Sequence, residues 1–60
     1  MIDIEIKPLQ GIENIFISRS FLNGSEIHNL TADSNSIEEF ISNYEFLFIE
    51  MFGENNFQYI

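Results

Sequence analysis

The first seven residues alternate strictly between apolar and charged side chains. Isoleucine occupies positions 2, 4 and 6, and charged residues occupy positions 3, 5 and 7. A period of two predicts a β-strand with one buried and one exposed face. Pro8 has no amide proton to donate to a neighbouring strand, so we expect this strand to end there or to lie at a sheet edge.

A β-hairpin is predicted in the next part of the chain. Residues 14–22 form the second expected strand, in which Ile15, Ile17 and Phe21 would share one face. Asn23 and Gly24 follow, and both residue types tolerate the positive φ angles of a type I′ turn. A third strand is therefore expected over residues 26–31.

The turn length decides which residues of the hairpin face each other. A two-residue turn pairs Phe21 with Glu26, Arg19 with His28 and Ile17 with Leu30. Ile15 would then join Ile17, Phe21 and Leu30 on one apolar face, and Arg19 could form an ion pair with Glu26 near the turn. A three-residue loop over residues 22–24 would instead place Arg19 opposite Ile27. The pattern leaves both registers open.

A helix is predicted to begin after Ser36. Ser36 and Glu39 have the spacing of a capping box, in which each side chain accepts a hydrogen bond from the backbone amide of the other residue. Gly53 is a natural helix stop. Between these ends, apolar residues recur at spacings of three and four and form one stripe that we expect to pack on the sheet: Ile37, Phe40, Ile41, Tyr44, Leu47, Phe48 and Met51.

These elements predict a single α+β domain over residues 1–60. We expect a three-stranded antiparallel sheet packed by one α-helix, with residues 57–60 forming either a short C-terminal strand or an aromatic tail that docks on the domain. A ubiquitin-like grasp fold is the alternative arrangement.

The opposite side of the predicted helix contains an anomaly. Phe46 lies opposite the centre of the apolar stripe and Ile49 lies about 60° away from Phe46, on a face that should be polar. An apolar anchor with carboxylates around it has the composition of a protein interface. We therefore predict a partner-binding surface composed of Phe46, Ile49, Glu38, Glu39, Ser42, Glu45 and Glu50.

Charge narrows the class of partner. Ten acidic residues against Lys7 and Arg19 give a formal net charge of −8, which disfavours nucleic acid and anionic membranes. Seven Phe residues are atypical of a disordered acidic tail. The longest apolar run, residues 46–49, is too short to cross a bilayer. The first seven residues have neither the basic start nor the apolar run of an export signal. We expect a soluble, cytoplasmic protein that binds a larger protein.

No residue pattern indicates catalysis or a cofactor. The chain has no Cys, so it cannot form a disulfide, and the single His28 cannot build a zinc site. His28 could in principle act as a base for Ser18 or Ser20 across the hairpin, but no third group is placed to orient it, and we expect it to face solvent. We predict no enzyme activity, no metal and no cofactor. Self-association then becomes the expected source of added stability for so short a chain, so we predict a homo-oligomer.

In its size, acidity, lack of Cys and α+β layout, the chain resembles the small inhibitors that bacteriophages make against host enzymes. These include anti-CRISPR, anti-restriction and other anti-defence proteins, some of which mimic DNA. The likeness covers the overall profile and no individual motif, and it implies inhibition by stoichiometric binding without a cofactor. The alternative is a structural or adaptor protein whose role is homo-oligomeric assembly.

Overall fold

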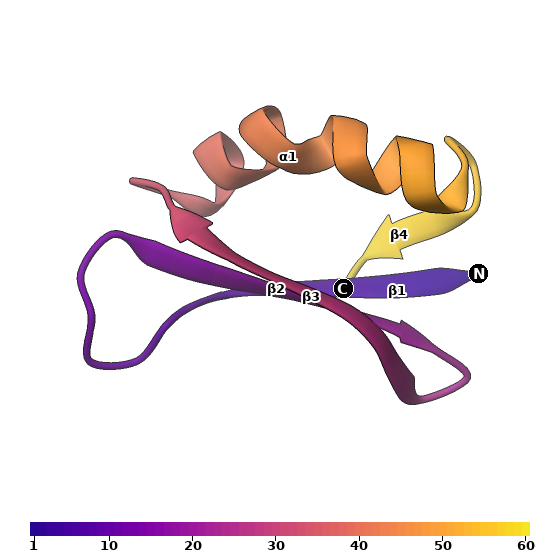
Figure 1. The fold of residues 1–60 in the computed structure, drawn as a ribbon, viewed down its shortest axis with the longest axis horizontal. Coiled ribbons are helices and arrows are strands. Elements are labelled where there is room, and N and C mark those ends of the chain that lie inside the picture. Colours follow the sequence, from indigo (N-terminus) through magenta and orange to yellow (C-terminus); the bar gives the residue numbers. More distant parts are fainter.

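A computed structural model describes all 60 residues and shows one helix packed on a four-stranded sheet. In Figure 1, α1 crosses one face of the sheet, and nothing covers the other face. The predicted α+β fold, with its short C-terminal strand, is confirmed. The elements in chain order are β1 (Ile2–Pro8), β2 (Ile15–Leu22), β3 (Ser25–Asp33), α1 (Ile37–Phe52) and β4 (Phe57–Tyr59).

The sheet has the strand order β3-β2-β1-β4 and is mixed. β2 is antiparallel to both β1 and β3, whereas β4 runs parallel to β1. Two backbone bonds fix β4 in place: the Ile2 amide donates to the Asn56 carbonyl, and the Ile60 amide donates to the Ile4 carbonyl, both at 2.9 Å. The first and last strands are therefore neighbours, although they lie at opposite ends of the sequence (Figure 1).

β1 confirms the alternation seen in the sequence. Ile4 is fully buried against the helix, and Ile2 and Ile6 on the same face pack around the core. The strand ends at Pro8, as the missing amide proton predicts. The charged residues between the isoleucines lie on the uncovered face, because side chains alternate across a strand.

The hairpin has the predicted two-residue turn but a different register beyond it. Asn23 and Gly24 have φ angles of 53° and 83°, and Phe21 faces Glu26 as expected. A β-bulge then leaves Ile27 unpaired and shifts every later pair by one residue. The expected pairs beyond Glu26 are wrong in both alternatives: Arg19 faces Asn29 rather than His28 or Ile27, and Ile17 faces Thr31 rather than Leu30.

The bulge also moves apolar side chains between the two faces of the sheet. Because one extra residue inverts the side-chain alternation, Leu30 lies opposite Ser18 on the helix side. The expected grouping of Leu30 with Ile15, Ile17 and Phe21 is therefore wrong. Those three residues lie half-buried on the uncovered face, whereas the helix side of β2 carries Phe16, Ser18 and Ser20.

The ends of α1 are those that the sequence predicts. The Ser36 side chain accepts a hydrogen bond of 3.1 Å from the Glu39 amide, and Gly53, with φ 92°, donates its amide to the Ile49 carbonyl. The second half of the capping box does not form, because the Glu39 carboxylate accepts from the Asn35 side chain instead. No helix in the structure is long and apolar enough to cross a bilayer.

The helix meets the sheet along one row of aromatic residues spaced four apart. Phe40 and Phe48 are fully buried, and Tyr44 and Phe52 pack beside them around Ile4. A row at this spacing runs at an angle to the helix axis, so stripe residues near the two ends turn away from the sheet. Ile37 and Met51, both expected in the core, are 39% and 44% exposed, and Phe52, absent from the predicted stripe, takes part.

We predict that Phe48→Ala destabilises the protein strongly, whereas Met51→Ala on the same helix does not. Deleting a buried phenyl ring costs about 3–5 kcal/mol because a cavity remains. A half-exposed methionine leaves no cavity, and its loss should change the free energy of unfolding by less than about 0.5 kcal/mol. Thermal and urea unfolding followed by circular dichroism measure both values. Equal effects of the two changes would show that the aromatic row does not hold the helix.

Candidate functional site

The side of α1 that faces away from the sheet carries two apolar side chains. Phe46 is 58% exposed and Ile49 is 36% exposed. At about 100° per residue, Phe46 points directly away from the row that contains Phe40 and Phe48. The C-terminal segment does not cover Phe46, because it joins the sheet as β4. The exposure that the helical spacing predicts for Phe46 is therefore present.

Carboxylates surround these two side chains. Glu38 and Glu39 lie in the first turn of α1 and Glu50 in the last, and all three are exposed. No Lys or Arg occurs between Ser36 and the C-terminus, so no cation on this segment offsets the carboxylates. We call this surface the acidic helix face, and it comprises Phe46, Ile49, Glu38, Glu39, Ser42, Glu45 and Glu50.

Glu45 differs from the other carboxylates of the acidic helix face because it already has a partner. It is half-buried, and the Tyr59 hydroxyl donates to its Oε2 at 2.6 Å. Burial raises the pKa of Tyr59 above its usual value, and the hydrogen bond to Glu45 and the charge of that carboxylate raise it further. This contact ties β4 to the helix, so Glu45 is held at the flank of the surface rather than presented to a partner.

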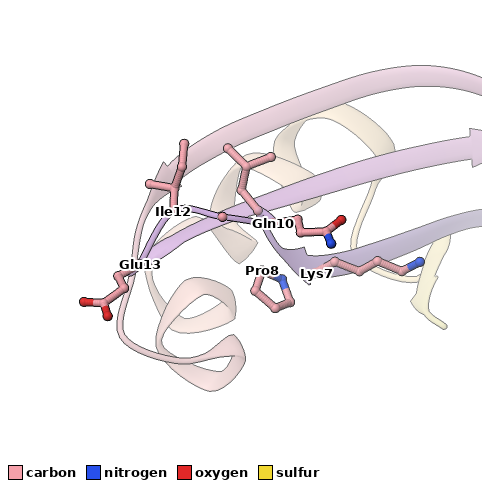
Figure 2. Close-up of a pocket in the computed structure, with 7 residues that line it drawn as sticks. Lys7, Pro8, Gln10, Ile12 and Glu13 are labelled. Atoms are coloured by element: carbon pink, nitrogen blue, oxygen red, sulfur yellow. The ribbon is translucent and has the colours of Figure 1, made fainter.

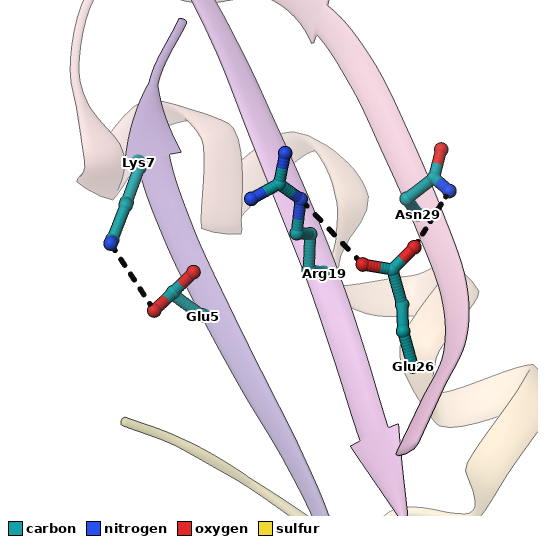
Figure 3. A network of polar contacts seen from close by, with 5 residues as sticks. All are labelled: Glu5, Lys7, Arg19, Glu26 and Asn29. Atoms are coloured by element: carbon teal, nitrogen blue, oxygen red, sulfur yellow. Dashed lines mark hydrogen bonds and ion pairs between the residues drawn. The ribbon is translucent and has the colours of Figure 1, made fainter. Parts of the chain in front are cut away.

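Both basic residues lie on the opposite side of the molecule. Lys7 Nζ is 3.4 Å from Glu5 Oε2, and Arg19 Nε is 3.6 Å from Glu26 Oε1. Figure 3 shows these contacts on the uncovered face of the sheet, where the Asn29 side chain also donates to Glu26 at 3.2 Å. The predicted ion pair between Arg19 and Glu26 is confirmed. The protein is therefore electrostatically two-sided, with its only cations remote from the acidic helix face.

The uncovered sheet face is a second exposed surface, which lies outside the predicted partner-binding surface. Ile15, Ile17 and Phe21 follow one another along β2 and are half-buried. Arg19 interrupts this line between Ile17 and Phe21, and Lys7 lies beside Ile17 on β1. The sequence already grouped these three residues on one face, and the pairing of β2 with β1 decides that this face is the uncovered one. Ser18 and Ser20 lie opposite Ile6 and Ile4 on the helix side, so the odd-numbered residues of β2 point away from the helix.

The possible catalytic pair of His28 with a hairpin serine has no access to a substrate. Ser20 does face His28 across the ladder, but Ser18 and Ser20 are fully buried beneath the helix. His28 does not face solvent as expected: it is half-buried, and its ring meets Phe52 edge-on with 6.5 Å between ring centroids. Neither serine Oγ nor His28 Nδ1 finds a hydrogen-bond partner in the protein. No group of three or more His, Cys, Asp or Glu side chains is placed to hold a metal ion.

A hollow of about 570 Å³ lies at the loop between β1 and β2. All of its lining residues come from the single segment 7–13, so no second element forms an opposite wall. Figure 2 shows that the Lys7 and Glu13 side chains extend outward from the loop in different directions. Small-molecule sites usually enclose most of their ligand between several elements, and this loop lacks that enclosure.

Comparison with known proteins places the chain in no family. It matches no protein-family model, no curated protein and no solved structure.

We predict that Ser20→Ala raises the free energy of unfolding by about 1 kcal/mol. A buried hydroxyl without a partner carries a desolvation cost of about 1–3 kcal/mol, which the methyl group of Ala removes. Ser25→Ala, on an exposed part of β3, serves as the control and should change stability little. A loss of stability in Ser20→Ala would instead mean that an internal water molecule satisfies the hydroxyl.

A second prediction concerns Tyr59. Its raised pKa keeps the phenol protonated in the folded state, whereas the unfolded chain loses that proton near pH ~10. The stabilisation is therefore complete below this pH and declines as the pH rises above it. Tyr59→Phe should lose about 1 kcal/mol of stability at neutral pH and should show a smaller alkaline decline than the parent.

Urea unfolding of both proteins from neutral to alkaline pH measures this difference. Glu45→Gln keeps an acceptor for the Tyr59 hydroxyl and should destabilise less than Tyr59→Phe at neutral pH. Parallel stability curves for the parent and Tyr59→Phe would contradict the assignment.

Proposed function

We propose that this protein is a small acidic inhibitor, encoded by a phage or another mobile element, that blocks a larger host enzyme by stoichiometric binding in the host cytoplasm. The observation that supports the proposal most directly is Phe46, a large side chain 58% exposed in the middle of a helix face that carries carboxylates and no cation. An apolar anchor within a charged rim is typical of a binding surface. The protein acts through this surface without catalysis or a cofactor.

The density of negative charge favours a target that normally binds nucleic acid. Glu38, Glu39, Glu45 and Glu50 are distributed over about 18 Å of helix, at 1.5 Å per residue. Their mean spacing along the helix is about 6 Å, which is within a factor of two of the ~3.4 Å between successive phosphates of a single DNA strand. A basic groove that attracts phosphates would attract the acidic helix face for the same reason. Defence nucleases and other nucleic-acid-handling enzymes have such grooves.

The two-sided charge distribution supports a defined orientation of approach. Lys7 and Arg19 lie on the uncovered sheet face, where nearby carboxylates pair with them. A positively charged target would therefore meet the helix side first, because long-range attraction acts on the uncompensated carboxylates. Phe46 and Ile49 would then supply the short-range apolar contact.

A second function, homo-oligomeric assembly as a structural or adaptor protein, is supported by the size of the core. Only three hydrophobic side chains are fully buried, namely Ile4, Phe40 and Phe48. Apolar side chains such as Ile27, 46% exposed, remain available for contacts between copies. Small cores of this kind commonly gain stability from oligomerisation. We propose that the protein self-associates in addition to binding its target.

The inhibitor proposal predicts that fold and binding separate in the double variant Phe46→Ser/Ile49→Gln. Neither side chain belongs to the core, so the circular dichroism spectrum and the melting temperature should match those of the parent. Loss of a central aromatic anchor should weaken target binding by about 2–4 kcal/mol. The target is captured from a bacterial lysate on immobilised parent protein, and its affinity for both proteins is then measured by surface plasmon resonance.

Ile12→Ser is the matched control, because Ile12 is 55% exposed but lies in the loop between β1 and β2. It should bind as the parent does. Reversal of Glu38 and Glu50 to Lys should slow association mainly at low salt, because exposed charges are screened as the ionic strength rises. Glu45 is left unchanged because it holds Tyr59. Capture of the same enzyme by the parent and the Phe46/Ile49 variant with equal affinity would contradict the proposal.

A further inference from the structure

The two edges of the sheet are protected very differently. β4 forms one edge with only three residues, Phe57–Tyr59, and its Tyr59 side chain is bound to Glu45 on the helix. β3 forms the other edge with nine residues, Ser25–Asp33, and pairs only with β2. A long edge strand presents a row of unpaired backbone groups to any other strand.

The hydrogen-bonding pattern shows which backbone groups of β3 are free. The Ser34 amide, next to β3, donates to the Asn14 carbonyl. The Leu9 amide, next to β1, donates to the Ile15 carbonyl from the other side of β2. Even-numbered residues of β2 therefore direct their backbone groups toward β3, and odd-numbered residues direct theirs toward β1. Because facing residues beyond the bulge are both even or both odd, Asn29, Thr31 and Asp33 direct their amide and carbonyl groups outward from the edge.

This edge lacks most of the features that prevent strands from pairing. Natural edge strands are commonly blocked by Pro, by Lys or by shortness, and residues 28–33 contain no Pro, Lys or Arg. The bulge at Ile27 interrupts the strand only near the hairpin turn. Six residues of regular strand therefore remain available for pairing.

We infer that β3 pairs antiparallel with β3 of a second copy of this chain, so that two four-stranded sheets join into one continuous sheet. This inference rests on the proposed self-association and locates it at the β3 edge. The sequence of the edge suits its own copy: with Leu30 at the two-fold axis, Asn29 lies opposite Thr31 and His28 lies opposite Ala32, and Asp33 lies just beyond the paired residues. No carboxylate then faces another across the axis, and the free backbone groups of Asn29 and Thr31 meet each other.

The geometry also sets the strength and the salt dependence of the dimer. A two-fold axis perpendicular to the sheet places both helices on the same side, so the two acidic helix faces repel each other. Each copy has a net charge of −8, and salt screens the repulsion over a distance of about 8–10 Å. A five-residue strand pair buries less area than the ~1,200 Å² of most stable interfaces. The dimer should therefore be weak, and high salt should strengthen it.

Thr31→Pro tests the inference by blocking the edge while leaving the fold intact. The Thr31 amide points outward, so its replacement removes no bond to β2, and Thr31 is exposed. The circular dichroism spectrum should match that of the parent. In sedimentation equilibrium, the dimer should weaken by about tenfold or more, the effect expected for the loss of one or two backbone hydrogen bonds. Phe46→Ser/Ile49→Gln, on the helix side, should dimerise as the parent does.

A second variant tests the contact directly and does not depend on how Thr31→Pro folds. Because the chain has no Cys, Asn29→Cys/Thr31→Cys introduces the only thiols, both on the exposed side of β3. Two-fold pairing centred on residue 29, 30 or 31 brings at least one pair of these thiols within disulfide reach. Mild oxidation should then give a cross-linked dimer in higher yield than the control Asn43→Cys/Phe46→Cys on the helix.

The possible results separate this inference from the function on which it rests. A parent protein that stays monomeric at all concentrations and salt levels overturns both self-association and the β3 interface. A parent dimer that Thr31→Pro leaves unchanged, or thiols on β3 that cross-link no better than those on the helix, overturn the interface alone. If the edge binds only strands of other proteins, the parent is monomeric, and the inference fails in the same way.

Discussion

The contact of one aromatic row of α1 with Ile4 is the interaction on which the rest of the structure depends. Phe40 and Phe48 bury their rings completely against β1, and Phe52 continues the row toward β4. A single helix can lie on only one of the two faces of a sheet. The opposite face of the sheet and the opposite face of the helix must therefore both meet water, and both candidate surfaces result from this single-layer coverage.

The distribution of charge follows from the same arrangement. Alternation in β1 sends Glu5 and Lys7 to the uncovered face, and β2 sends Arg19 to that face as well. The helix receives carboxylates alone, because its sequence contains no basic residue. Exposed ion pairs contribute little stability. One side of the molecule carries both basic residues in ion pairs, whereas the helix carries carboxylates alone.

The small core connects stability with association. The buried hydroxyls of Ser18 and Ser20 occupy positions where larger apolar side chains would add to the core, and neither finds a partner in the protein. Contacts outside the core, such as the bond between Tyr59 and Glu45, therefore carry a larger share of the stability. Pairing of β3 with a second copy would add backbone hydrogen bonds without requiring further core residues. It would also leave the acidic helix face free to bind another protein.

The sequence by itself determined the features that depend on neighbouring residues. The alternation of β1 up to Pro8, the turn at Asn23 and Gly24, and the helix ends at Ser36 and Gly53 all follow from local backbone preferences and hydrogen bonds. The exposure of Phe46 follows from helical spacing. These predictions hold because the interactions that decide them span only a few residues.

Tertiary structure decided the features that depend on distant parts of the chain. The bulge at Ile27 reversed the face of Leu30, because the packing of β3 beneath the helix, rather than the turn, selects the register. The angle at which α1 crosses the sheet moved Met51 outward and brought Phe52 into the core. Glu45 belongs to the predicted surface by spacing, but Tyr59 engages it only because β4 returns beside β1. Local patterns cannot specify such contacts, since their energy appears only when distant segments meet.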